Sequence, residues 1–109
     1  MFFVHEKDRS GEEVKIGEKI IEGTLRKIIS TGERIQLFQV GIKGGTEFPE
    51  HSHPNEQAGY IIQGKFEVNI GGEKGILEKG HYFWIPKDVP HSGFVQEDTI
   101  MVEIYSPPR

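Results

Sequence analysis

Three histidines and a glutamine have the types and spacing of a metal-binding site. His51 and His53 are two residues apart, Gln57 follows closely, and His91 lies far downstream. Residues two apart on an extended strand project from the same face, so both imidazoles would point the same way. Imidazole nitrogen and amide oxygen can both bind a divalent metal. The sequence therefore predicts one metal ion held by His51, His53, Gln57 and His91.

The charge of this donor set predicts an electrophilic site. All four donors are neutral, so they would leave the double positive charge of the ion uncompensated and attract an anionic substrate. An octahedral ion would keep two positions open for water or substrate, which is typical of a catalytic site. Imidazole suits nickel, manganese, iron, cobalt, copper and zinc, so the sequence predicts a divalent transition metal without identifying it.

Three other polar residues near this motif are interpreted differently. Glu56 is the alternative ligand to Gln57, but neighbouring residues of a strand project from opposite faces, so Glu56 is expected to point away from the histidines. His5 and His81 are expected to be ordinary surface histidines. His81 directly follows the turn residue Gly80.

The C-terminal segment holds the candidate catalytic residues. Alternation over residues 100–105 puts Glu103 and Tyr105 on one face of a strand. If this face lines a barrel, Glu103 is a candidate general acid or base. Two prolines precede Arg109 and would hold the tail extended, so that its guanidinium could grip a carboxylate with two hydrogen bonds. The alternative is an edge-strand glutamate followed by a frayed terminal arginine.

The composition limits the class of protein. A chain of 109 residues suits one domain. Its net charge of −4 does not favour binding to nucleic acid. The absence of cysteine excludes disulfides and thiolate metal sites. The apolar segment at residues 1–4 is too short to cross a membrane. A cytoplasmic protein without nucleic-acid or membrane partners is expected.

Short apolar segments between glycine and proline turns predict an all-β domain. Strands are expected over residues 24–29, 34–42, 58–62, 65–70, 73–77, 81–85, 91–95 and 99–105, with a tight hairpin turn at Gly71-Gly72. Residues 11–22 are interpreted as a weak helical turn. The single domain, residues 1–109, is expected to comprise an N-terminal arm (about 1–30), a barrel core (about 31–105) and a tail (106–109).

Two motifs resemble those of the cupin superfamily. The first comprises Gly45, His51, His53, Gln57 and Gly64, and the second comprises Gly80, Pro86, Asp88 and His91. Cupins usually have glutamate where Gln57 stands and glycine where Asp88 stands. The resemblance implies a double-stranded β-helix, or jelly-roll barrel, with one metal inside, and it implies a homodimer.

Segments 51–57, 85–91 and 105–109 resemble a narrower family, KdgF, whose members are small cupins that open unsaturated uronates in pectin and alginate breakdown. In that family three histidines and one glutamine hold the metal, which matches the four predicted ligands. An acidic residue, an aromatic residue and an arginine serve catalysis there. Glu103, Tyr105 and Arg109 occupy these positions, where the family typically has Asp, Phe and Arg.

The resemblance implies a metal-dependent, isomerase-like enzyme that converts a 4,5-unsaturated uronate monosaccharide to its linear keto form. Glu103 would move protons, Arg109 would bind the substrate carboxylate, and Tyr105 would shape the pocket. Two alternatives stay open, namely a metal-dependent dioxygenase and a non-catalytic cupin that binds a sugar or another effector. The expected partners are a small anionic, sugar-like substrate and a second copy of the chain.

Overall fold

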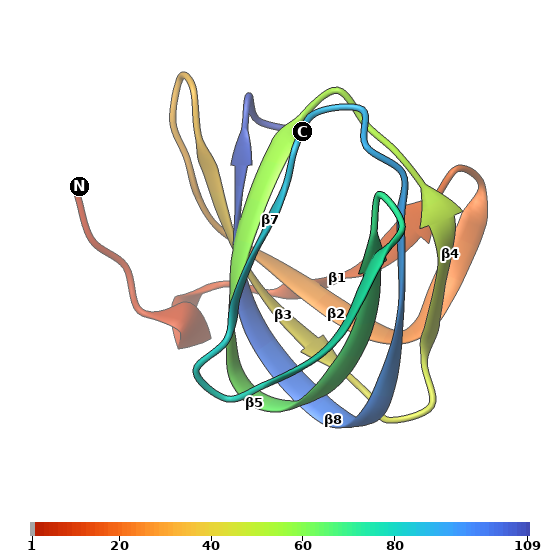
Figure 1. The fold of residues 1–109 in the computed structure, drawn as a ribbon. Coiled ribbons are helices and arrows are strands. Elements are labelled where there is room, and N and C mark those ends of the chain that lie inside the picture. Colours follow the sequence, from red (N-terminus) through yellow and green to blue (C-terminus); the bar gives the residue numbers. More distant parts are fainter. Residues whose placement is uncertain (1) are drawn as a thin grey trace.

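Eight antiparallel strands form two facing layers in the computed structural model, which describes residues 2–109 (Figure 1). The strands are β1 (Gly11–Ile16), β2 (Lys19–Thr31), β3 (Gln36–Ile42), β4 (Glu47–His51), β5 (Glu56–Ile70), β6 (Glu73–Glu78), β7 (Tyr82–Ile85) and β8 (His91–Ser106). A short 3-10 helix at Glu6–Asp8 precedes them. The predicted all-β jelly-roll barrel is confirmed.

The two longest strands, β5 and β8, belong to both layers. Residues 99–105 of β8 pair with β3, whereas residues 91–94 pair with β4. β5 lies beside β8 along its length, from Glu56 opposite Ser106 to Ile70 opposite His91. One layer therefore has the order β1-β2-β3-β8-β5-β7, and the other has the order β4-β8-β5-β6.

The bend of β5 from one layer to the other falls at Gly64. Its φ of +109° favours glycine, and the register of β5 against β8 shifts around it. The strands predicted at 58–62 and 65–70 are therefore two halves of β5, just as those at 91–95 and 99–105 are two halves of β8. The predicted hairpin at Gly71-Gly72 is confirmed, because Ile70 pairs directly with Glu73.

The N-terminal part of the chain differs from the expectation. Residues 11–22 form β1 and the start of β2, so the predicted helical turn is wrong. β2 also pairs with β3 along residues 24–31, which places this part of the expected arm inside the sheet. The reason is tertiary, because inward-facing Ile21 and Thr24 are buried against the barrel. Gly17, which weakens a helix, lies in the turn between β1 and β2, where its φ of +62° favours glycine.

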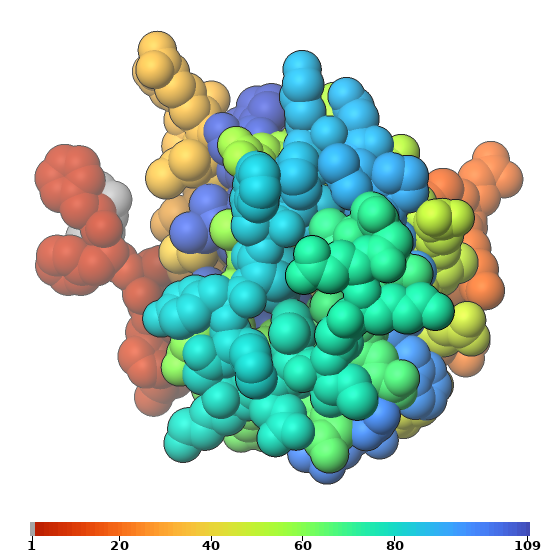
Figure 2. All heavy atoms as spheres, in the orientation of Figure 1, coloured from red at the N-terminus to blue at the C-terminus, as the bar shows by residue number. Residues whose placement is uncertain are grey.

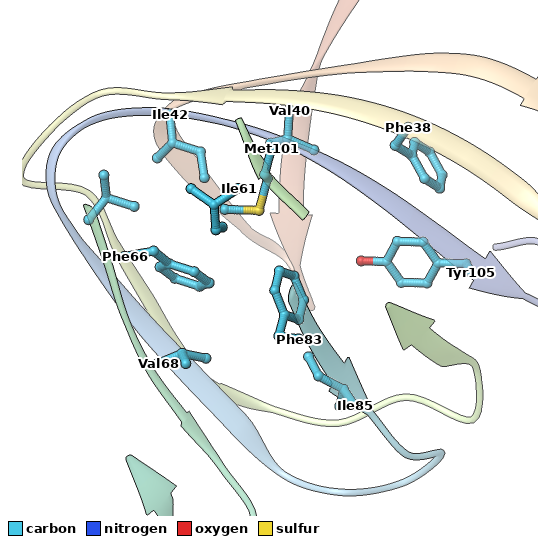
Figure 3. Close-up of a cluster of buried hydrophobic side chains, with 11 residues drawn as sticks. Phe38, Val40, Ile42, Ile61, Phe66, Val68, Phe83, Ile85, Met101 and Tyr105 are labelled. Carbon is cyan, nitrogen blue, oxygen red and sulfur yellow. The ribbon is translucent and has the colours of Figure 1, made fainter. Parts of the chain in front are cut away.

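The apolar core fills the space between the layers (Figure 3). Its members are Phe38, Val40, Ile42, Ile61, Phe66, Val68, Phe83, Ile85, Val95, Met101 and Tyr105. Figure 3 shows the Tyr105 hydroxyl pointing toward the middle of the cluster, beside Phe38. The two rings meet edge to face with their centroids 5.2 Å apart. The core therefore contains a polar group at the end of the barrel that holds the candidate site.

The N-terminal residues project from the body of the barrel (Figure 2). Phe2 and Phe3 are exposed there without an apolar partner on the barrel.

Across residues 2–109 no helix is long and apolar enough to cross a membrane. The homodimer stays a prediction.

Replacing Gly64 by alanine is expected to destabilise the protein by at least about 2 kcal/mol, because strained φ and overpacking each cost about 1–3 kcal/mol. The added Cβ would lie 2.5 Å from the Thr99 Cα. Gly41→Ala is the matched control, since its Cβ meets nothing within 4 Å. Urea unfolding followed by circular dichroism measures both variants. Equal stability of the two variants would contradict the steric role of Gly64.

Candidate metal centre and active site

Strand pairing places the three predicted histidine ligands together. His51 ends β4 and pairs with His91, which begins β8. β4 ends there because its partner strand offers no further residue. His53 therefore lies beyond the strand, in the segment that leads to β5, and the prediction that one strand presents both His51 and His53 is wrong. Figure 1 shows this segment, the segment between β7 and β8 and the C-terminus at the same end of the barrel.

The three imidazoles nevertheless converge. Ring centroids lie 4.2 Å apart for His51 and His91, 5.0 Å for His53 and His91, and 6.0 Å for His51 and His53. One nitrogen from each ring lies within 4.8 Å of the others. His53 and His91 are buried, and His51 is half-buried. A cluster of three neutral nitrogen donors at this spacing could hold a metal ion.

Backbone carbonyls orient each of these rings. Nδ1 lies 2.8 Å from the Pro49 oxygen in His51, 3.0 Å from the Asn55 oxygen in His53, and 2.8 Å from the Val89 oxygen in His91. A carbonyl only accepts, so each Nδ1 carries the hydrogen and donates it. Each neutral ring then presents its Nε2 lone pair, which is how protein histidines are prepared for a metal.

Gln57 adds a fourth donor to the histidine cluster. Its Nε2 donates to Glu103 Oε2 at 2.5 Å, which leaves Oε1 facing His53 Nε2 at 3.1 Å. Because His53 donates from Nδ1, its Nε2 and the Gln57 oxygen meet as two lone pairs without a hydrogen between them. A cation would satisfy both atoms. The donor set therefore fits a divalent metal held by His51, His53, Gln57 and His91.

Burial keeps two of the histidines neutral. It lowers the pKa of His91 to about 4 and also lowers the pKa of His53, with a smaller contribution from the positive charge of Arg109. Both rings therefore have a free lone pair at neutral pH in the metal-free protein. Neutral imidazole is the form that binds a metal, so no proton must be displaced from these two rings before binding.

The remaining histidines and Glu56 lie where the sequence indicated. Glu56 is exposed and accepts a hydrogen bond from Trp84 Nε1 at 2.6 Å, on the face opposite Gln57. His5 and His81 are exposed, and each accepts a backbone hydrogen bond near a turn. None of the three reaches the histidine cluster.

Glu103 and Tyr105 face the interior from β8, as the predicted alternation requires. Glu103 is 9% exposed and Tyr105 is 5% exposed. Burial raises the pKa of the Glu103 carboxyl to about 7, although the hydrogen bond from Gln57 acts in the opposite direction. Burial also raises the pKa of the Tyr105 phenol. Glu103 can therefore hold or release a proton near neutral pH, as a general acid or base must.

The C-terminal tail brings Arg109 back over the site. Its guanidinium carbon lies 5.0 Å from the centroid of the Tyr105 ring. Two buried residues that the sequence analysis missed anchor the tail. Asn55 Nδ2 donates to the Pro107 oxygen at 2.6 Å, and the Arg109 backbone N–H donates to Gln36 Oε1 at 2.8 Å. These contacts join residues far apart in sequence, so local spacing held no signal for them.

Six of the seven predicted site residues line one cavity of about 160 Å³, namely His51, Gln57, His91, Glu103, Tyr105 and Arg109. The seventh, His53, lies beside it with its ring centroid 5.5 Å from that of Tyr105. Thr24 and Arg26 of β2 also line the cavity, although sequence reasoning placed them in an arm. The arrangement combines a candidate metal centre, a buried carboxyl and cationic side chains in a single cavity.

Comparison with known proteins identifies the class to which this fold and site belong. Residues 38–106 match the family described as Cupin domain. The chain therefore belongs to the cupin family, as its motifs predicted.

Within this family the chain is similar to KdgF. It is 31% identical over 94 residues to the pectin degradation protein KdgF of Dickeya dadantii (strain 3937), across 84% of this chain and 86% of that protein. The structure of KdgF from Halomonas sp. superposes with a TM-score of 0.86 at 28% identity, covering 98% of this chain and 94% of that one. The predicted resemblance to KdgF is confirmed.

A second relative has a different recorded activity. The chain is 30% identical over 104 residues to quercetin 2,3-dioxygenase of Bacillus subtilis (strain 168), across 90% of this chain. It spans only 30% of the length of that dioxygenase. The match therefore supports the shared cupin barrel more strongly than a shared reaction.

Replacing His91 by alanine is expected to weaken metal binding at least about a hundredfold, because it removes one nitrogen donor from the cluster. Calorimetric titration of the metal-free protein with nickel chloride measures the affinity. His81→Ala is the matched control, since it removes an exposed histidine outside the site. Loss of affinity in both variants, or in neither, would contradict the assigned donor set.

Proposed function

We propose that this protein is a metal-dependent enzyme that converts 4,5-unsaturated uronate monosaccharides to their linear keto form. The observation that carries the proposal is the placement of Gln57, Glu103 and Arg109 in one cavity beside the histidine cluster. Similarity to KdgF, a pectin degradation protein, favours the same substrate class. The cavity thus has groups that could bind a carboxylate, bind sugar oxygens and transfer a proton.

The reaction is an isomerisation and needs no co-reactant. The bond between the anomeric carbon and the ring oxygen breaks, the anomeric hydroxyl loses its proton, and C4 of the double bond gains one. The former ring oxygen becomes the new ketone oxygen, so the atoms balance. A single residue that accepts a proton at one position and returns it at another is sufficient for this chemistry.

Glu103 is the residue suited to this proton transfer. Among residues 2–109 it is the only acidic side chain that lines the cavity. Burial raises its pKa to about 7 in the metal-free protein, where both protonation states are accessible at neutral pH. Arg109 forms no ion pair among residues 2–109, so its guanidinium can pair with a substrate carboxylate. Tyr105 lines the same cavity and would shape it, with its ring against the Arg109 guanidinium.

A divalent metal on His51, His53, Gln57 and His91 would supply Lewis-acid polarisation of substrate oxygens. The protein's own contribution is to orient the four donors through the carbonyl contacts of the histidines and the amide contact between Gln57 and Glu103.

The direct test is turnover of an unsaturated uronate. The metal-loaded protein is mixed with the unsaturated monosaccharide released from polygalacturonate, and loss of the enol absorbance is followed. Proton NMR of the product identifies the linear keto form. Enzyme-dependent loss of absorbance is expected, and a rate equal to that of buffer alone would refute the proposal.

Glu103→Gln is expected to lower kcat at least about a hundredfold, because the isosteric amide cannot transfer the proton. The KM should change little, since the size of the side chain and its contact with Gln57 are preserved. Glu56→Gln is the matched control, because Glu56 is exposed and points away from the cavity. If the kcat of Glu103→Gln equals that of Glu56→Gln, Glu103 is not the residue that transfers the proton.

A dioxygenase is the second candidate, and it is favoured only by the similarity to quercetin 2,3-dioxygenase. The cationic lining of the cavity suits an anionic substrate better than a neutral flavonol. Oxygen uptake by the iron- or copper-loaded protein in the presence of quercetin would favour the dioxygenase, and its absence would favour the isomerase.

A further inference from the structure

The inner face of β2 carries polar groups that the proposed reaction does not use. Thr24 and Arg26 are two residues apart on this strand, so their side chains share a face, and both line the cavity. Thr24 pairs with Ile42 and Arg26 pairs with Val40, both on β3. These two residues therefore lie on the β2 wall, whereas Glu103 and Tyr105 come from β8 and Arg109 from the C-terminal tail.

Each of the two residues has a buried polar atom without a partner. Within residues 2–109 only Thr24 Oγ1 and Arg26 Nε are buried side-chain atoms that make no hydrogen bond. Thr24 is only 5% exposed. Buried polar groups are nearly always paired, so an exception needs an explanation. The predicted metal ligands and Glu103, by contrast, all have hydrogen-bond partners.

The surroundings of Arg26 hold its guanidinium in place. The guanidinium carbon lies 4.6 Å from the centroid of the Phe38 ring, and Nη2 forms an ion pair with Glu12 Oε1 at 3.2 Å. Glu12 offsets part of the charge but leaves Nε–H free. Arg26 is thus a fixed hydrogen-bond donor whose charge is partly compensated, which suits a neutral oxygen better than a carboxylate.

Arg26 and Arg109 lie against the two members of one aromatic pair. Arg26 contacts Phe38, and Arg109 contacts Tyr105. The two rings, which Figure 3 shows side by side, meet edge to face. The cavity therefore offers a carboxylate site at Arg109 and a separate group of hydrogen-bonding atoms at Thr24 and Arg26. A small sugar acid has both kinds of group, a carboxylate and ring hydroxyls.

We propose that Thr24 and Arg26 form a subsite that binds the ring hydroxyls of the sugar acid, and the assignment of this ligand class rests on the proposed function. Arg26 Nε–H donates to a hydroxyl oxygen, and Thr24 Oγ1 donates to or accepts from a hydroxyl. This subsite distinguishes epimers that differ at one ring hydroxyl, because only the correct epimer satisfies both buried atoms.

Thr24→Val tests the subsite, because it removes the hydroxyl and keeps the shape. The KM for the unsaturated uronate is expected to rise about tenfold, with kcat changed less than about threefold, as expected for a lost binding contact. The unfolding temperature should rise by about 4 °C, since an unpaired buried hydroxyl is removed. Thr24→Ser should have a KM close to that of the wild type, because it keeps the hydroxyl. Arg26→Lys, which lacks Nε–H, should raise the KM as Thr24→Val does.

Ser30→Ala is the matched control, since it removes an exposed hydroxyl from the same strand. A KM for Thr24→Val equal to that of Ser30→Ala would overturn the subsite and leave the proposed function standing. Should the wild-type protein show no turnover, calorimetric binding of the unreactive sugar acid galacturonate decides instead. Weaker binding of galacturonate by Thr24→Val than by Thr24→Ser supports the subsite even if the protein has no catalytic activity. Equal binding, or no binding by the wild type, overturns it.

Discussion

The pairing of β5 with β8 is the constraint on which both the barrel and the candidate site depend. In this register Gln57 lies opposite Tyr105 and Gly59 lies opposite Glu103. Directly opposite residues of antiparallel strands share a face, so one register brings the amide, the carboxylate and the phenol into the cavity together. A slip of one residue would turn Glu103 outward and bring Ile104 inward, so the candidate site forms only in this register.

The Gln57 side chain joins the candidate metal centre to the buried carboxyl of Glu103. Its oxygen faces His53, and its amide hydrogen is donated to Glu103. A carboxylate at position 57 would lie against Glu103 as a second negative charge and could not donate to it. The amide therefore lets a buried carboxyl lie next to the ligand set. Its hydrogen bond favours the ionised form, burial favours the protonated form, and the resulting pKa is about 7.

Local patterns made part of this structure predictable from the sequence. Alternation along residues 100–105 and the turn glycines indicated the strands, because these signals lie within a few residues. The donor set was indicated by residue type and by the resemblance of two separated motifs to those of cupins, since His91 lies far from His53 in the sequence. β1 and the first residues of β2 were missed because they are stabilised by pairing with each other rather than by their own composition. The contact between Gln36 and Arg109, 73 residues apart, exists only once the barrel has closed.

The distribution of charge explains how the barrel tolerates two guanidinium groups at one cavity. Each of them lies over a ring of the Phe38–Tyr105 pair, so part of its lost hydration is replaced by cation–π attraction. Glu12 compensates Arg26 at the surface, whereas Arg109 has no such partner among residues 2–109. A neutral ligand set around a divalent ion would add positive potential rather than cancel it. Compensation is therefore weakest at Arg109, and that is where a substrate carboxylate would gain the most.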